Sequence, residues 1–159
     1  MREIGEQMGH IVQVSISPGG VPKTAVAEAR VNINGLVGDR QATPKIHGGP
    51  ERAVCLWSQE MIDQLRQEGH PIAAGSAGEN VTIVGLDWIQ ITPGVKLKLG
   101  AEVLLEIASY AAPCRTNARW FSNRRYSRIS QAKYPGSSRL YARVLSGGMI
   151  RPGDVVEIV

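Results

Sequence analysis

EIASYAAPCRTNARWF, residues Glu106–Phe121, is the stretch that decides the fold predicted for this chain. It begins as the end of Ala101–Ser109, where apolar side chains occupy alternate positions and so predict a strand with one buried face. It then passes Pro113 and one cysteine, Cys114, and enters a polar run rich in arginine. A thiol is therefore expected where an ordered strand ends, and this makes Cys114 the first candidate for chemistry.

Further strands are expected at short spacing along the chain. They alternate in the same way or are short apolar runs between turn residues: His10–Ser17, Ala25–Ile33, Ala53–Trp57, Val81–Val84, Trp88–Ile91, Val95–Leu99, Leu140–Leu145 and Asp154–Val159. Strands and helices do not alternate, which argues against a parallel doubly wound sheet. The pattern predicts a mainly β fold, an antiparallel closed β-barrel with a few short helices inserted.

Two segments carry helical signals. Ser58 is placed to cap a short helix whose apolar stripe is Met61, Ile62 and Leu65. Arg115–Tyr134 contains neither Gly nor Pro and predicts one or two helices. The helix predicted to start at Arg115 would begin directly after Cys114.

The composition is that of a globular chain without a membrane segment. The 159 residues are 43% apolar and 20% charged, which predicts a single domain over 1–159, with 1–9 as a loosely ordered N-terminal segment. Aromatic residues make up only 5%, so the core is expected to be aliphatic. There is no apolar run of membrane-spanning length, no signal-peptide pattern and no disulfide framework. A cytoplasmic location with both cysteines reduced follows as an expectation.

Charge is distributed unevenly. Between Ile107 and Gly153 there is no Asp or Glu, although this stretch holds nine of the 18 basic residues of the chain. One interpretation is a solvated basic face. The other is an anionic partner, either a phosphate-bearing cofactor or a nucleic acid.

The two cysteines have opposite surroundings. Cys114 is followed by Arg115 and by an expected helix, and both features favour a thiolate. Such a thiolate could serve as a nucleophile, a persulfide carrier or a ligand for a soft or high-valent metal, whereas the plain alternative is a small buried hydrophobe. Cys55 lies inside the apolar run AVCLW and is predicted to pack in the core.

Two loops offer further candidate residues. KIHGGPER supplies donors at Lys45, His47 and Arg52, and its glycines Gly48 and Gly49 allow close approach of the backbone to an anion. It lacks the spacing of a P-loop, and a surface turn is the alternative. In GENVTI, Glu79 and Asn80 precede a strand; an amide there suits the edge of a heterocycle, or it opens an Asx-type turn.

Other functional classes find less support. A Cys–His–Asn protease is conceivable, but no local protease signature surrounds Cys114. A single histidine and one distant cysteine are too few for a zinc site. The basic stretch contains several aromatic residues but no RNP or cold-shock pattern, which argues against nucleic-acid binding.

Several short motifs occur in an order that is similar to a known family. They are VGD at Val37–Asp39, HGG at His47–Gly49, RAV at Arg52–Val54, GEN at Gly78–Asn80, GL at Gly85–Leu86, PC at Pro113–Cys114, LYARVLSGG at Leu140–Gly148 and PGD at Pro152–Asp154. The ordered set resembles the MOSC domain, the molybdenum cofactor sulfurase C-terminal domain, in its stand-alone bacterial form. The resemblance covers the chain from about residue 10 to 159.

The resemblance implies a β-barrel whose key cysteine is matched by Cys114. In stand-alone relatives and amidoxime-reducing enzymes that cysteine holds molybdenum, and N-hydroxylated compounds are reduced. In sulfurase-type members the domain is fused to a pyridoxal-phosphate desulfurase. In the amidoxime-reducing proteins, basic and hydroxyl side chains near the cysteine hold the pterin phosphate. Ala111 and Ala112 stand before Pro113 here, so other residues must hold it.

The expected function is therefore that of a molybdenum-cofactor-binding oxidoreductase component, with Cys114 as metal ligand and a separate reductase as electron donor. The alternative is a persulfide carrier or cofactor chaperone that works with a cysteine desulfurase, pyridoxal phosphate then being on that partner. A basic nucleic-acid-binding barrel is a third, weaker alternative. The residues expected to bind the pterin cofactor are Lys45, His47, Gly48, Gly49, Arg52, Glu79, Asn80, Arg115, Asn117 and Arg119.

Overall fold

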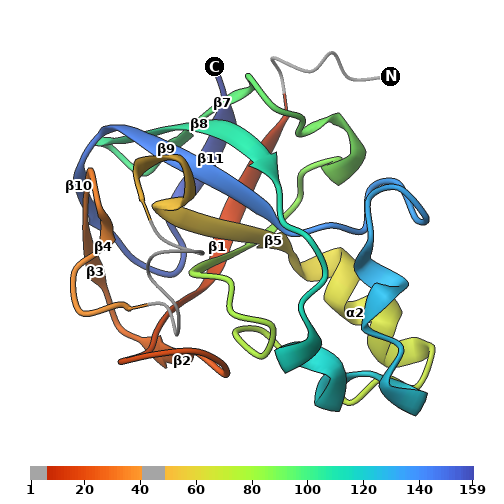
Figure 1. The fold of residues 1–159 in the computed structure, drawn as a ribbon. Helices are drawn as coiled ribbons and strands as arrows, with labels where there is room; N and C mark the ends of the chain where they lie inside the picture. Colours follow the sequence, from red (N-terminus) through yellow and green to blue (C-terminus); the bar gives the residue numbers. More distant parts are fainter. Residues whose placement is uncertain (1–6, 41–48) are drawn as a thin grey trace.

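The computed structural model describes residues 7–40 and 49–159, and within them seven strands close into a barrel (Figure 1). The strands follow the order β11–β7–β8–β9–β5–β6–β1, and β1 pairs back with β11. Their bounds are β11 (Val155–Ile158), β7 (Lys96–Leu99), β8 (Val103–Tyr110), β9 (Leu140–Ser146), β5 (Val54–Ser58), β6 (Val81–Val84) and β1 (Met8–Ile16). The predicted closed barrel is confirmed.

A second, smaller sheet lies beside the barrel, next to β8 and β9 (Figure 1). It has the order β10–β3–β4 and consists of β10 (Gly148–Ile150), β3 (Ala29–Asn32) and β4 (Gly35–Leu36). The predicted strand Ala25–Ile33 is therefore wrong as a single element, because β2 (Thr24–Val26) pairs with β1 while β3 pairs with β10. The sequence interpretation also missed β10, which lies within a segment expected to be a connection.

One strand pair departs from the predicted antiparallel pattern. β5 and β6 are parallel, with Leu56 opposite Val81. A parallel pair requires a crossover connection, and here helix α2 (Gln59–Gln67) forms the first part of the connection from β5 to β6. Ser58 caps α2 as predicted, since its Oγ accepts a hydrogen bond from the Met61 amide at 3.1 Å.

Short helical turns replace two predicted elements. The predicted strand Trp88–Ile91 is a 3₁₀ turn, η3 (Trp88–Gln90), and the Trp88 indole donates to the Ser138 carbonyl at 2.8 Å. A short apolar run does not distinguish a strand from a buried turn, which explains the error. A further turn, η2 (Pro50–Arg52), precedes β5.

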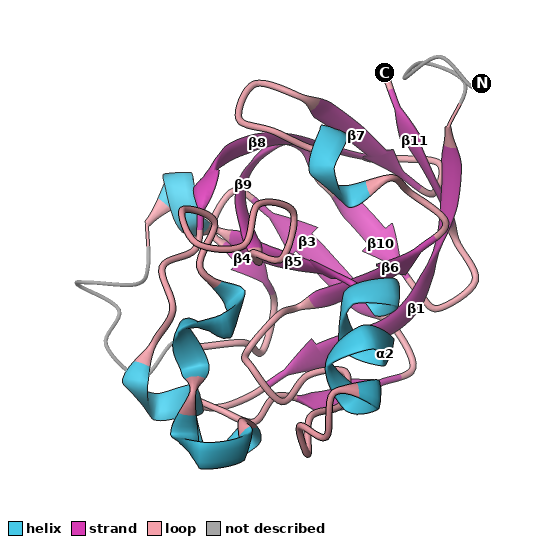
Figure 2. Ribbon diagram, turned by 90° about the vertical axis from the view of Figure 1, so that its right-hand side faces the viewer, coloured by secondary structure: helices cyan, strands magenta, loops and turns pink. Residues whose placement is uncertain are grey.

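The predicted helices of Arg115–Tyr134 are three 3₁₀ turns instead (Figure 2). They are η4 (Arg115–Trp120), η5 (Ser122–Arg124) and η6 (Tyr126–Ile129). Left-handed backbone at Asn123 and Arg124 interrupts the helical path, so no continuous helix forms. The turns are fastened to α2 and its following loop, because Ser122 donates its amide to His70 Nδ1 at 3.0 Å and Arg128 pairs with Glu68.

The barrel interior is mostly aliphatic, as predicted, although Trp57 on β5 is also fully buried. Every residue of β5 is buried, and inward side chains such as Leu97, Leu105 and Ile107 are at most 1% exposed. Each fully buried Leu or Ile contributes about 1.5–3 kcal/mol relative to an exposed one. Strand β1 starts at Met8, two residues earlier than the expected strand His10–Ser17. No helix of the described residues is long and apolar enough to cross a membrane.

Candidate functional site

An open pocket lies where β5, β8 and β9 meet the loop that carries Cys114. Its cavity volume is about 220 Å³. Three basic side chains and both cysteines of the chain contribute to its wall: Lys23, Arg52, Arg139, Cys55 and Cys114. Tyr110 and Tyr141, from β8 and β9, add aromatic surface. The pocket therefore combines thiol, cationic and aromatic groups.

Cys114 follows the end of β8 and immediately precedes η4. Its thiol is partly exposed, and Sγ lies 3.0 Å from the Thr116 hydroxyl oxygen. Its carbonyl accepts a hydrogen bond from the Asn117 amide, which starts the turn. The α-helix that was expected to support a thiolate here is a six-residue 3₁₀ turn. The thiol is thus presented by a strand end and a turn, with Thr116 beside it.

Cys55 faces the same pocket from β5 but differs chemically from Cys114. It is 6% exposed, and burial raises the pKa of its thiol to about 11. Tyr141 on β9 is its direct cross-strand partner, and burial likewise raises the pKa of the Tyr141 phenol. The structure confirms Cys55 as a buried residue and adds that it borders the pocket, which the sequence did not indicate.

Lys23 is a pocket residue that sequence analysis missed. Its ammonium group lies 2.6 Å and 2.8 Å from the two carboxylate oxygens of Asp39, and both side chains are almost fully buried. The same carboxylate accepts the Ser17 amide at 2.9 Å and the Asn80 side-chain amide at 2.9 Å. Asp39 belongs to the VGD motif. The structural role of this motif is therefore to hold a buried lysine at the pocket.

Asn80, predicted to recognise a cofactor edge, is engaged with the protein itself. Its Nδ2 donates to the Ser15 carbonyl and to Asp39, and its Oδ1 accepts the Cys55 amide at 2.9 Å. Both amide hydrogens are therefore occupied. Asn80 lines the pocket, and these hydrogen bonds support a positioning role there, while contact with a cofactor stays a prediction.

Glu79 is completely buried and does not line the pocket. One carboxylate oxygen accepts bonds from the Gly75 amide at 2.9 Å and the Thr82 hydroxyl at 3.1 Å. The other oxygen has no hydrogen-bond partner. Burial raises the pKa of this carboxyl to about 7, so Glu79 is easily protonated near neutral pH.

Arg139 is a second pocket residue that sequence analysis missed. It is 5% exposed, and its guanidinium donates to the carbonyls of Ala77 and Ala112 at 3.0 Å and 2.8 Å. None of the carboxylates in the described part of the chain forms an ion pair with it, and its Nε is buried without a partner. Asn117 donates to the same Ala77 carbonyl at 3.1 Å, and its buried Oδ1 also lacks a partner.

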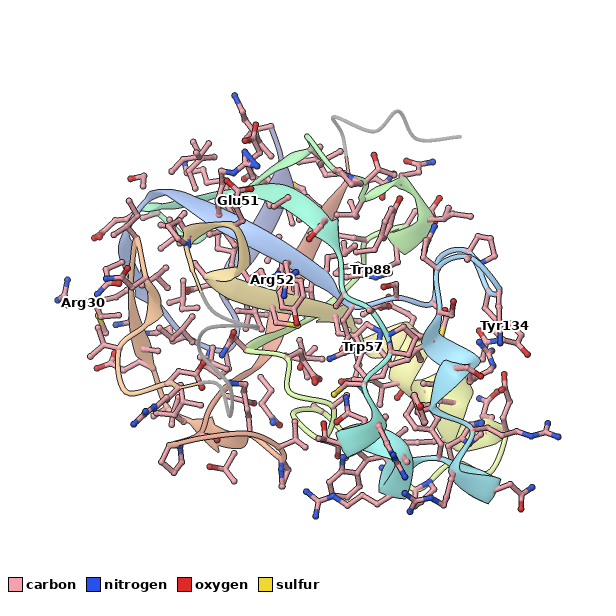
Figure 3. The ribbon with its side chains drawn as sticks, in the orientation of Figure 1. Arg30, Glu51, Arg52, Trp57, Trp88 and Tyr134 are labelled. Carbon is pink, nitrogen blue, oxygen red and sulfur yellow. The ribbon has the colours of Figure 1, made fainter. Side chains whose placement is uncertain are left out.

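The remaining predicted residues are distributed around this pocket. Arg52 lines it, with its guanidinium 5.5 Å from the Tyr141 ring centre, and Figure 3 shows it beside β5. Arg115 and Arg119 are exposed on η4. Gly49, with φ of 98°, precedes η2 and is absent from the pocket lining. Lys45, His47 and Gly48 lie outside the described residues.

Local sequence could not have identified Lys23 or Arg139. Neither belongs to a recognisable motif, and they reach the pocket from a loop after β1 and from the residue before β9. Only closure of the barrel brings these two cations to the same cavity as Cys114.

Comparison with known proteins identifies relatives of this chain. The family model of the MOSC domain matches residues 43–157. The chain is 30% identical over 139 residues to the uncharacterized protein YflK of Bacillus subtilis, covering 86% of this chain and 60% of the relative. It is 31% identical over 133 residues to a protein of Gibberella moniliformis named "Reductase", covering 80% and 23%. Protein YiiM of Escherichia coli is 30% identical over 112 residues, covering 64% and 49%.

Solved structures show the same fold. YiiM from Geobacillus stearothermophilus has a TM-score of 0.72 at 25% identity, covering 95% of this chain and 75% of that one. The YUAD protein of Bacillus subtilis has a TM-score of 0.77 over 95% of both chains, and at 16% identity this likeness concerns the fold alone. The chain spans 60% or less of the length of the three curated relatives.

Proposed function

Because this chain belongs to the MOSC domain family, we propose that it binds a pterin-based molybdenum cofactor, with Cys114 as the protein ligand of the metal. We further propose that it is the molybdenum-bearing component of an oxidoreductase that reduces N-hydroxylated compounds. The relative named "Reductase" supports the reaction class. Electrons would come from a separate reductase protein.

The residues present fit such a cofactor. Among the described residues no cluster of three or more His, Cys, Asp or Glu could hold a bare metal ion. A metal that arrives with its own sulfur ligands needs only one further donor, and the Cys114 thiol is a soft donor of the appropriate kind. The buried Arg139, which forms no ion pair with any of the described carboxylates, suits an anionic group in the same pocket.

The proposed roles of several pocket residues follow from their contacts. Cys114 would hold the metal, with the Thr116 hydroxyl 3.0 Å from its sulfur as a hydrogen-bond partner. Arg139 would balance the negative charge of the cofactor phosphate, in place of the side chains absent at Ala111 and Ala112, whereas the charge of Lys23 is already paired with Asp39. When bound, the cofactor would supply metal-centred electron exchange with the substrate.

The observation that carries this proposal is the shared pocket. A partly exposed thiol, two cations that sequence analysis overlooked and Arg52 all line one cavity. A core-packing cysteine would not need the buried Arg139 beside it, since burying a charge is costly unless the charge has a partner, and none of the described carboxylates forms an ion pair with Arg139.

Metal analysis of purified protein tests the proposal. The protein would be isolated without oxygen from a host rich in molybdenum cofactor, together with Cys114→Ser and, as matched control, Cys55→Ala. We expect near-stoichiometric molybdenum in the wild type and in Cys55→Ala, and none in Cys114→Ser. Molybdenum retained by Cys114→Ser contradicts the assignment of the ligand.

The same preparation distinguishes the proposed oxidoreductase from the alternative, a persulfide carrier. If intact mass shows an added sulfur on Cys114 and no molybdenum is present, the chain is a persulfide carrier and the oxidoreductase proposal fails. A cysteine desulfurase would then be the partner that supplies the sulfur.

A further inference from the structure

A cluster of exposed arginines lies beside the Cys114 pocket. We call Arg115, Arg119, Arg124 and Arg125 the arginine face; all four are exposed on η4, η5 and the residue after it. No ion pair within the described part of the chain includes any of them. The sequence from Ile107 to Gly153 has no acidic residue, so the turns that carry this face add no negative charge of their own.

The turns that carry the arginine face are fixed by hydrogen bonds to the segment after α2. Ser122, between η4 and η5, donates its amide to His70 Nδ1 at 3.0 Å and its hydroxyl to the Gly69 carbonyl at 2.8 Å. Arg128 on η6 forms two hydrogen bonds with Glu68, at 2.9 Å and 2.8 Å. A surface that is ordered before a partner arrives loses little conformational entropy on binding.

Backbone conformation at the centre of the face is unusual. Asn123 and Arg124 are consecutive non-glycine residues with φ of 56° and 57°. This left-handed conformation is unfavourable for residues with side chains, and it persists only where surrounding contacts enforce it. It turns the chain within η5, just before η6, and both Arg124 and Arg125 remain exposed there.

The arginine face reaches the rim of the pocket. Arg119 Nη2 donates to the Val21 carbonyl at 2.7 Å, and Val21 lines the pocket. Cys114 directly precedes η4, and Asn117 within η4 also lines the pocket. In Figure 3 side chains fan outward from these turns at the lower edge of the molecule, below the labelled Arg52 and Trp57.

We propose that the arginine face is the docking surface for an acidic electron-carrier protein that delivers electrons to the Cys114 pocket. This inference rests on the proposed oxidoreductase function. Arginine forks match carboxylate groups in a two-point geometry, and arginine is enriched at protein interfaces. Uncompensated charge also accelerates the encounter with a partner of opposite sign.

Contacts in the arginine face and on the neighbouring turn η6 favour an acidic protein over nucleic acid. The Arg119 guanidinium lies 4.6 Å from the Trp120 ring centre, and that of Arg128 lies 4.5 Å from the Tyr134 ring centre. Single-stranded nucleic acid binds strongly where aromatic rings are available for base stacking. Here arginine already covers a face of these rings.

Binding by cofactor-free protein tests this inference independently of catalysis. The probe is flavodoxin, an acidic flavoprotein that carries electrons, immobilised for affinity measurement at low and at physiological salt. The variants Arg124→Glu and Arg125→Glu are compared with Arg30→Glu, which makes the same charge change on β3, at the opposite side of the molecule in Figure 3. A single-stranded DNA of generic sequence is measured in parallel.

We expect the dissociation constant for flavodoxin to rise about tenfold in each arginine-face variant and less than about twofold in Arg30→Glu. Added salt should weaken wild-type binding. No binding to flavodoxin, equal losses in all three variants, or tighter binding to DNA than to flavodoxin each overturns the proposal. Because these measurements need no metal, they can succeed even if molybdenum binding fails, and they can fail while molybdenum binding holds.

Discussion

Asn80 donates a hydrogen bond from Nδ2 to Oδ2 of Asp39 at 2.9 Å, although the two residues are 41 positions apart. The same carboxylate holds the Lys23 ammonium, and Asn80 Oδ1 accepts the amide of Cys55. The VGD and GEN motifs are therefore two halves of one buried polar network. This network fixes a cation and a β5 residue at the wall of the pocket.

Removing the charge of Asp39 should destabilise the protein strongly. In Asp39→Asn the buried Lys23 loses its anionic partner, and a buried charge left without its partner typically costs about 3–5 kcal/mol. Urea denaturation measures the loss. The control is Asp63→Asn, on the exposed side of α2, where a change below about 0.5 kcal/mol is expected. Equal stability of the two variants would show that the ion pair is not important.

Glu79 should make stability fall as pH rises. The folded-state pKa of its carboxyl is raised to about 7 by burial, whereas the ordinary value is 4.5. Between these values the native state holds a proton that the unfolded state has released. The stability present below about pH 4.5 is therefore lost progressively up to about pH 7. Integrated over that window, the loss is roughly 3 kcal/mol.

Glu79→Gln removes this pH dependence. Urea denaturation at about pH 4.5 and about pH 8 measures the free energy of unfolding of both proteins. Relative to the wild type, the variant should become more stable as pH rises. Glu28→Gln, which removes a half-exposed carboxylate, serves as control and should follow the wild type. A stability difference between wild type and Glu79→Gln that is the same at both pH values would refute the assignment of a raised pKa.

The two cysteines should differ in reactivity. Cys114 is partly exposed, whereas Cys55 is buried and its thiol has a pKa of about 11. Because only the thiolate is alkylated, iodoacetamide at about pH 8 should modify the native protein once, at Cys114. Intact mass and peptide mapping check this. Cys114→Ser should remain unmodified until it is denatured, and a second adduct on the native wild type would contradict the burial of Cys55.

Gly75 should tolerate no side chain. Its φ is 85°, its amide donates to Glu79, and a Cβ would overlap the carbonyl oxygen of Lys23. Gly94 has a similar φ of 94° but open space around it. Gly94→Ala therefore isolates the conformational cost, about 1–2 kcal/mol, while Gly75→Ala should cost about 3 kcal/mol or more. Thermal unfolding compares them, and similar losses would mean that the backbone angle alone matters.

Much of the barrel was predictable because its strands are defined locally. Alternation in His10–Ser17 and Ala101–Ser109, and the apolar run before Ser58, each coincide with an observed strand. The cap at Ser58 also depends only on neighbouring residues. In contrast, the Trp88 turn and the three 3₁₀ turns after Cys114 arise from tertiary contacts and left-handed backbone, which periodicity does not report.

The sequence by itself determined a β-rich barrel and singled out Cys114. Adjacent residues encode both the alternation of the strands and the change from strand to basic segment at Pro113–Cys114. Only the tertiary structure decided which groups surround that thiol. Lys23 and Arg139 come to the pocket from segments far apart in the chain, and Cys55 faces it from a central strand. Their positions depend on strand register and barrel closure, which are long-range pairings that no local pattern specifies.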